Sequence, residues 1–183
     1  MTQKSIEKAL EIIAVISGLL YAWLYLNNES ICWYFAFIGA AIFTWLCYKR
    51  NILAEAGLQV FYMVMAIYGF LKTNIVWQED FWSLQNHFLL LGSSIAGTIL
   101  LSFILKQKTQ SALPLTDSFT TVFAISGTLL MVNMVHINWA YWIAVDAISI
   151  YLYYKRGMKF GAFLFLIYLI MAIDGFFKLQ FFY

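Results

Sequence analysis

The segment Asn138–Arg156 combines an apolar composition with polar side chains at helical spacing. These side chains recur every four, four and three residues, at Asn138, Trp142, Asp146 and Ser149. Residues three or four apart share one face of an α-helix, so they form a single polar stripe. A carboxylate attracts cations, and an indole stacks on flat or positively charged rings. The stripe therefore predicts a binding surface for a cationic or polyhydroxyl ligand around Trp142 and Asp146.

A structural interpretation competes with this one. Asp146 could instead form an ion pair or a hydrogen bond between helices. Trp139, at the start of the segment, is more simply explained as an anchor at the membrane interface.

The whole chain is too apolar for a soluble domain. Its 183 residues are 63% hydrophobic and 11% charged, whereas about 25% of the residues of soluble domains are charged. Apolar segments near the ~20 residues that cross a bilayer are predicted at 6–26, 30–48, 52–71, 87–105, 117–135, 138–154 and 160–177. We therefore expect an all-α protein with seven transmembrane helices in the lipid bilayer, and a buried Asp146 that faces the bundle interior or a watery cavity.

Loop charges predict the orientation. Of the 11 Lys and Arg residues, all but Lys72 and Lys178 lie near the N-terminus or in the loops after the second, fourth and sixth segments. Because positively charged loops stay cytoplasmic, we expect a multi-pass protein of the bacterial inner (plasma) membrane with a cytoplasmic N-terminus and an external C-terminus. The charges are scattered over short loops and do not indicate a nucleic-acid partner.

The chain repeats itself at a displacement of 106 residues. Tyr48-Lys49-Arg50 coincides with Tyr154-Lys155-Arg156, and Gly69-Phe70 coincides with Gly175-Phe176 in the same register. A displacement of 109 residues adds the first segment, with Ile16-Ser17-Gly18 on Ile125-Ser126-Gly127. The matched glycines are expected to serve packing or capping.

The repeat predicts a 3+1+3 arrangement: a first repeat over 1–72, a loop and linker helix over 73–108, and a second repeat over 109–183. An odd number of helices would invert the second triplet, so the linker helix makes the internal repeat parallel. Transporters use parallel repeats of this kind, which favours transport as the function.

The polar residues do not follow the repeat. Asp146 aligns with Ala40, Trp142 with Ala36, and Glu55 with Gly161. A symmetric framework with asymmetric polar groups suits an asymmetric ligand.

The third segment supplies a second set of candidate binding residues. Glu55, Gln59 and Tyr62 fall on one helix face and could orient a ligand by hydrogen bonds. Such residues also hold helices together, and Glu55 could pair with the nearby Lys49.

Two further candidates lie near segment ends. His87 opens the fourth segment and could line an outer entrance or simply sit at the interface. Thr121 follows the polar start of the fifth segment, where Asp117 is expected to be the N-cap.

The sequence contains no catalytic constellation, metal motif or phosphate-binding loop, so we expect no enzyme activity, no metal, no cofactor and no ATP-driven transport. A retinal protein would need a lysine inside the last helix, and Lys159 and Lys178 flank it. Cys32 and Cys47, roughly 22 Å apart on one helix, cannot pair with each other.

Two strings of the C-terminal half resemble the PnuC-type vitamin transporters. They are Asp117-Ser118-Phe119-Thr120-Thr121 and the Asn-Trp-x-x-Trp-x-x-x-Asp pattern that starts at Asn138. Gln59, Tyr62 and Tyr68-Gly69 fit the first half of the family pattern. By resemblance, Gln59, Asn138, Trp142 and Asp146 would bind substrate.

The resemblance implies a 3+1+3 fold with a SWEET-like architecture. It also implies facilitated diffusion of a vitamin, followed by trapping through a cytoplasmic kinase. Members carry nicotinamide riboside, and PnuT relatives carry thiamine. Riboside carriers usually end the third helix with Tyr-Gly-Trp-x-x-Trp, where this chain has Tyr68-Gly69-Phe70-Leu71-Lys72. We therefore expect thiamine, with nicotinamide riboside as the alternative.

Other classes stay open at this point. A membrane sensor that binds without transport would share these features, and a sugar facilitator is a third possibility that Asp146 makes less natural. A homo-oligomer is possible, since a lipid-facing surface gives no guide to an interface.

Overall fold

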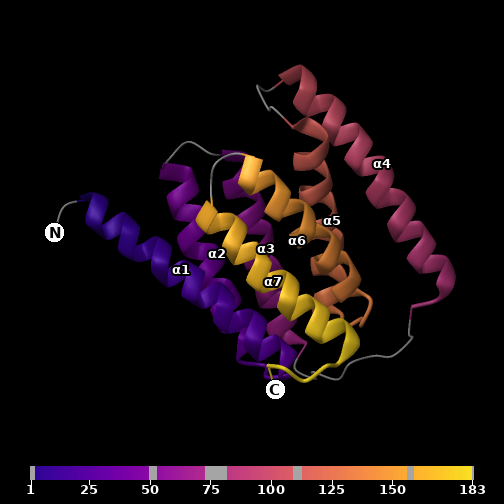
Figure 1. Ribbon diagram of the computed structural model, residues 1–183, viewed down its shortest axis with the longest axis horizontal. Coiled ribbons are helices and arrows are strands. Elements are labelled where there is room, and N and C mark those ends of the chain that lie inside the picture. The colour runs from indigo at the N-terminus through magenta and orange to yellow at the C-terminus, as the bar shows by residue number, and fades with distance from the viewer. Residues whose placement is uncertain (1–2, 50–52, 73–81, 109–112, 156–158, 183) are drawn as a thin grey trace. The chain divides into compact units, whose positions relative to one another are not determined.

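The computed structural model is helical throughout most of the residues that it describes, 3–49, 53–72, 82–108, 113–155 and 159–182. The helices in these ranges are α1 Gln3–Leu26, α2 Cys32–Lys49, α3 Leu53–Leu71, α4 Leu84–Lys108, α5 Pro114–Val132, α6 Asn138–Lys155 and α7 Lys159–Phe177 (Figure 1). The predicted all-α fold with seven helices is confirmed. The observed ends lie within three residues of the predicted ones.

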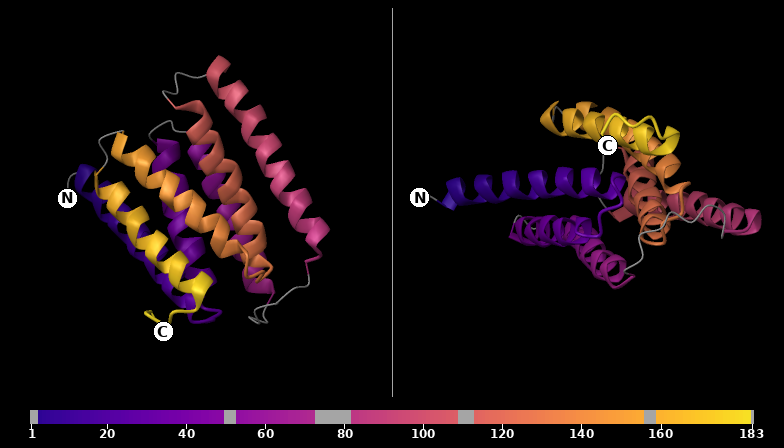
Figure 2. Two further views of the ribbon diagram at one scale, coloured as in Figure 1. Left: turned by 45° about the vertical axis from the view of Figure 1, so that its right-hand side comes forward. Right: turned by 90° about the horizontal axis from the view of Figure 1, so that it is seen from below.

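The chain forms two compact units, residues 1–76 with 182–183 and residues 77–181. In the first unit, α2 packs against both α1 and α3. In the second unit, α6 packs against both α5 and α7, and α4 lies along α5 (Figures 1 and 2). Each triplet therefore has a middle helix, and α4 is the additional helix of the 3+1+3 order.

Helix boundaries repeat at a displacement of 106 residues. The middle helices begin at Cys32 and Asn138, and the last helices of the triplets end at Leu71 and Phe177. The first helices follow the same displacement, since α1 ends at Leu26 and α5 at Val132. The predicted displacement of 109 residues for the first segment is therefore wrong. Three residues are nearly one helical turn, so the shifted Ile-Ser-Gly match still falls on the same face.

The turns before the middle helices repeat as well. Asn28 and Met134 are equivalent, and both have left-handed backbones with φ of 58° and 56°. The backbone N–H of the next residue closes each turn: Glu29 donates to Leu24 at 2.9 Å and Val135 donates to Leu130 at 3.0 Å. The turns that lead into α2 and α6 are thus built alike.

A tryptophan–glycine contact fixes the end of each triplet. A Cβ added to Gly69 would lie 2.6 Å from the Trp33 ring, and a Cβ added to Gly175 would lie 2.5 Å from the Trp139 ring. Both rings are buried. Trp139 is therefore a packing residue rather than the interfacial anchor that we predicted. The predicted packing role of the two glycines is confirmed.

The fifth helix begins earlier than predicted. Pro114 lies in its first turn after Leu113, a position where the missing N–H of proline costs nothing. Asp117 is not the N-cap, because its own N–H already donates to the Leu113 carbonyl at 3.0 Å. Its carboxylate lies in the first turn, where the helix dipole favours a negative charge.

A pair of buried hydroxyls joins α4 to α5. The Ser94 and Ser126 Oγ atoms are 2.8 Å apart and share a hydrogen bond. One hydroxyl donates to the other, and the other donates to a carbonyl of its own helix, with Ser94 2.7 Å from the Leu90 carbonyl and Ser126 3.1 Å from the Val122 carbonyl. These bonds fix α4 against α5 near the middle of both helices.

Within the described residues, four helices are long and apolar enough to cross a membrane by length and composition alone: α1, α2, α4 and α5. The fully described apolar parts of α3 and α7 are shorter, Ala56–Leu71 and Ala162–Phe177. α6 is not among the four, and its Asn138, Asp146 and Lys155 lower its mean hydropathy. The helix with the predicted polar stripe is therefore less apolar than an ordinary membrane span.

Candidate binding site

The polar stripe of α6 is buried. Asn138, Asp146 and Ser149 are 0%, 2% and 3% exposed, and Trp142 is half-buried. At about 1.5 Å per residue, the stripe from Asn138 to Asp146 is roughly 12 Å long. That length suits a small molecule of two linked rings.

Two polar atoms of this stripe have no hydrogen-bond partner in the part of the chain that the structure describes. They are the Asn138 Oδ1 and the Trp142 Nε1. The Asn138 Nδ2 donates to the Val135 carbonyl at 2.7 Å, which orients the amide and leaves its oxygen as a free acceptor. Because a buried polar group without a partner costs about 1–3 kcal/mol, this acceptor and this donor are suited to a ligand.

Asp146 lies one turn beyond Trp142. Tyr168 of α7 is near enough to interact with it electrostatically. Among the described residues, no Lys, Arg or His forms an ion pair with Asp146. The interpretation of Asp146 as an internal ion pair therefore has no support in the described part of the chain.

An aromatic cluster borders Trp142. Phe123 and Val145 form a buried core, against which Phe119, Tyr141 and Trp142 pack. The Phe119 and Phe123 rings are stacked with centroids 4.1 Å apart, and Phe123 lies 5.6 Å from Tyr141. Our sequence reasoning missed this cluster, although Phe119 and Phe123 at i and i+4 share a face of α5. In a chain with 20% aromatic residues, that spacing did not stand out.

Two other predicted residues of the second unit make contacts away from α6. The Thr121 hydroxyl donates to the Asp117 carbonyl of its own helix at 2.8 Å. The His87 ring lies 5.7 Å from Trp82, just before α4. Neither contact involves the polar stripe.

The remaining predicted residues belong to the first unit. Gln59 and Tyr62 are half-buried on α3, and the side chain of Glu55 lies outside the described residues. Lys49 pairs with Glu7 of α1, at 2.7 Å between Nζ and Oε1. At the end of α3, the Phe70 ring contacts Tyr34 with centroids 4.8 Å apart and is partly exposed.

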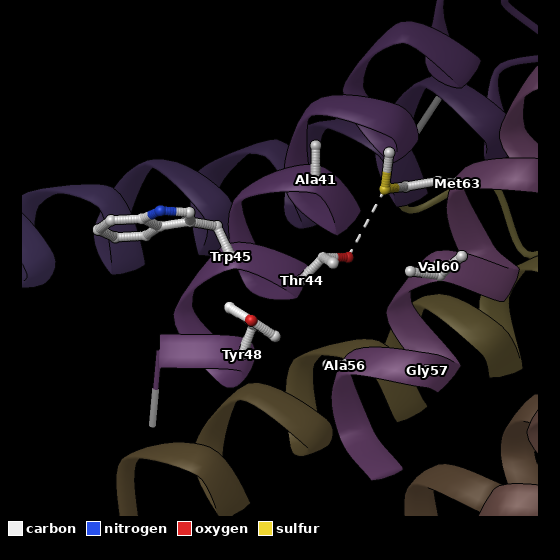
Figure 3. A pocket seen from close by; sticks show the side chains of 8 residues that line it. All are labelled: Ala41, Thr44, Trp45, Tyr48, Ala56, Gly57, Val60 and Met63. Carbon is white, nitrogen blue, oxygen red and sulfur yellow. Dashed lines mark hydrogen bonds between the residues drawn. The ribbon is translucent and has the colours of Figure 1, made fainter. Parts of the chain in front are cut away.

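The first unit also has a groove, and none of the predicted residues is among its described lining residues. It has a volume of about 490 Å³ and is lined by Ala41, Thr44, Trp45, Tyr48, Ala56, Gly57, Val60 and Met63 of α2 and α3 (Figure 3). The Thr44 hydroxyl inside it already donates to the Ala40 carbonyl at 2.8 Å. The equivalent of Gly57 in the second unit is the exposed Phe163, so this groove is not part of the shared framework.

Two matched helical triplets with a linker helix, and a polar stripe buried in one of them, define a polytopic membrane protein built in the manner of a transporter. In the described residues, no group of three His, Cys, Asp or Glu side chains could hold a metal ion. Comparisons with known proteins agree with this class.

A model of the nicotinamide mononucleotide transporter family matches residues 8–180. The chain belongs to this family. A crystal structure of the vitamin B3 transporter PnuC is similar in fold, with a TM-score of 0.72 at 21% sequence identity. The match covers 92% of this chain and 79% of the other. The predicted resemblance is confirmed, and the family is one of transporters rather than enzymes.

Proposed function

We propose that this transporter carries a cationic aromatic vitamin, which binds at the polar stripe of α6. The observation that supports the proposal most strongly is Asp146, a buried carboxylate without a described ion-pair partner. A charge at the centre of a membrane helix costs roughly 3 kcal/mol on insertion scales. A cationic substrate would offset this cost by supplying the missing opposite charge.

The neighbouring groups fit such a substrate. Trp142 and the aromatic cluster supply ring faces, which attract a positively charged ring by about 0.5–2 kcal/mol. The Asn138 Oδ1 and the Trp142 Nε1 supply one acceptor and one donor for a hydroxyl or an amide. An anionic phosphate would meet a carboxylate instead of a base, so the dephosphorylated riboside suits this stripe better than the mononucleotide.

Two vitamins satisfy these conditions. Thiamine is our first candidate, because the chain has Phe70-Leu71-Lys72 at and just after the end of its third helix, in place of the tryptophans that riboside carriers usually have there. Nicotinamide riboside is the second, and the family description and the similar vitamin B3 transporter favour it. Both carry a positively charged aromatic ring and a hydroxyl, so the α6 stripe accepts either.

We further propose facilitated diffusion, with a cytoplasmic kinase that traps the vitamin by phosphorylation. The charge distribution of the loops supports an inner-membrane protein with its N-terminus in the cytoplasm. Gln59, Tyr62, Glu55, His87 and Thr121 stay predicted contributors to binding.

The proposal is tested by titrating the purified full-length protein with thiamine, nicotinamide riboside, nicotinamide mononucleotide and glucose. We expect one of the two cationic vitamins to bind at least tenfold more tightly than the mononucleotide or glucose. Equal affinity for a cationic and an anionic ligand would refute the role of Asp146.

A second measurement separates a transporter of this vitamin from a protein that only binds it. Empty proteoliposomes should take up the bound vitamin to its external concentration and no further, without ATP or an ion gradient. Binding without any uptake would leave a receptor and contradict facilitated diffusion.

A further inference from the structure

Gly127 of α5 lies directly against the indole of Trp142. A Cβ added to this buried glycine would be 3.5 Å from the Cε2 and Nε1 atoms of Trp142 and 3.3 Å from the Tyr141 Cβ. The first distance is ordinary contact, and the second is tight. One added methyl group therefore nearly fits, but any larger side chain would occupy the space of the indole.

In the first unit, the large and the small side chain of this contact are exchanged between the two helices. Tyr21 is equivalent to Gly127, and Ala36 is equivalent to Trp142. The Tyr21 ring packs against Tyr25 and Trp33, with centroids 5.9 and 5.7 Å away. The large side chain thus comes from the outer helix in the first unit and from the middle helix in the second.

The backbone of α5 is held in place next to Gly127. The adjacent Ser126 shares its hydrogen bond with Ser94 of α4 at 2.8 Å. One turn earlier, Val122 lies close to α4, since a Cβ added to Gly97 would be 3.3 Å from its Cγ1. An added Cβ alone would press most on the Tyr141 Cβ of α6, whereas a side chain larger than that of alanine would displace the indole before it displaced α5.

We propose that Gly127 is a positioning residue for substrate binding, which lets the Trp142 indole lie against α5 and so sets the ring position that meets the vitamin. The proposal rests on the proposed function. The proposal also assigns a structural role to the linker helix α4, which fixes the part of α5 that supports the indole.

The test compares Gly127→Ala and Gly127→Val in wild-type and Trp142→Phe backgrounds. Affinity is measured by titration with thiamine and nicotinamide riboside, and folding is measured by the thermal unfolding temperature. We expect Gly127→Ala to weaken binding severalfold and Gly127→Val to weaken it at least tenfold. In the Trp142→Phe background, the fold-loss of affinity from each substitution should be less than half as large. The smaller phenylalanine ring leaves space for the side chain added at position 127.

Gly92→Ala is the matched control, since a Cβ at Gly92 of α4 meets nothing within 4 Å. It should leave affinity unchanged. Wild-type affinity in a folded Gly127→Val variant, or an equal loss in both backgrounds, would overturn the positioning role. If Gly127→Val does not fold, Gly127→Ala decides the question by the same comparison.

Failure of the proposed function gives a different result. If the wild-type protein binds neither vitamin, the proposed substrate class is refuted. The contact between Gly127 and the Trp142 indole is then tested by unfolding temperatures alone. Gly127→Val should then lower the unfolding temperature much less in a Trp142→Ala background. Equal lowering in both backgrounds would show that Gly127 does not support the indole.

Discussion

The two helical triplets share a framework but differ in what fills it. Both have a left-handed residue before the middle helix and a tryptophan against a glycine near the end of the last helix. In the first triplet, small residues bring α1 close to α2: a Cβ on Gly39 would lie 3.4 Å from the Ala14 carbonyl and 3.5 Å from the Ser17 Cβ.

The second triplet has larger residues at the equivalent contact. Gly39 is replaced by Val145, and Ser17 by Phe123, which pack together in its core. Trp142 packs against them, and Asp146 follows Val145 in the chain. The counterparts of Trp142 and Asp146 in the first triplet are two alanines, Ala36 and Ala40. The comparison teaches that the repeat preserves the contacts that hold the helices together, while of the two middle helices only that of the second triplet carries proposed binding residues.

The largest expected effect comes from moving the carboxylate into the first triplet. Ala40→Asp would bury a charge beside a tight contact between helices. A buried charge that has no partner costs about 3–5 kcal/mol of stability. We expect a variant that unfolds at a much lower temperature or does not accumulate. Asp146→Ala, its counterpart, should be as stable as the wild type or more so. A stable Ala40→Asp variant would show that the two triplets are more alike than we argue.

The shared framework predicts equal losses from the two tryptophan–glycine contacts. Gly69→Ala and Gly175→Ala each force a Cβ to within 2.6 Å of an indole ring. Overpacking of this kind costs about 1–3 kcal/mol, so both variants should lose stability to a similar extent. Thermal unfolding measures the loss, with Gly57→Ala as the control because its Cβ meets open space. A loss of stability in only one of the two variants would show that the two tryptophan–glycine contacts are not equivalent.

Because only the second triplet carries the polar stripe, substitutions of tryptophans in the two triplets should differ in their effect on vitamin affinity. Trp142→Ala should weaken vitamin binding more than tenfold, a change of about 1.4 kcal/mol, because the ring face and the indole N–H are lost. Trp45→Ala removes an exposed tryptophan of α2 and should leave affinity unchanged. Equal losses in both variants, by titration, would point to general damage rather than to a site on α6.

The smallest effect concerns α4, which has no counterpart in the first triplet. Ser94→Ala removes the hydrogen bond to Ser126 and should cost about 1 kcal/mol of stability. Ser93→Ala is the control, since the neighbouring Ser93 is exposed and its hydroxyl donates to the Leu90 carbonyl of its own helix. An unchanged unfolding temperature in Ser94→Ala would mean that this bond does not hold α4 to α5.

Much of the fold could be predicted because apolar length and the repeat both leave direct traces in the sequence. Tyr-Lys-Arg and Gly-Phe at the same displacement located the middle and last helices of both triplets. The first helices were misaligned by three residues, because a shift of nearly one turn preserves the apolar face. The fifth segment was predicted to start at 117, three residues late, because proline also suits the first turn of a helix, where Pro114 lies.

The site was only partly predictable. Asn138, Trp142 and Asp146 stood out because their spacing is helical and their neighbours are apolar. Phe119, Phe123 and Gly127 did not, because an aromatic or a glycine on an apolar helix has the same appearance whether it packs against lipid, core or site. Their roles depend on which face of α5 meets α6, and that face is set by packing between helices.

The most direct test of the account is the affinity of Asp146→Asn for thiamine and for nicotinamide riboside, measured by calorimetric titration. Asparagine keeps the size of the side chain and removes its charge. Glu29→Gln is the control, since it removes one carboxylate from an exposed turn of the first unit. The account predicts that Asp146→Asn folds normally and binds the preferred vitamin more than tenfold more weakly, whereas Glu29→Gln binds as the wild type does. Wild-type affinity in a folded Asp146→Asn protein would contradict the cationic site on α6.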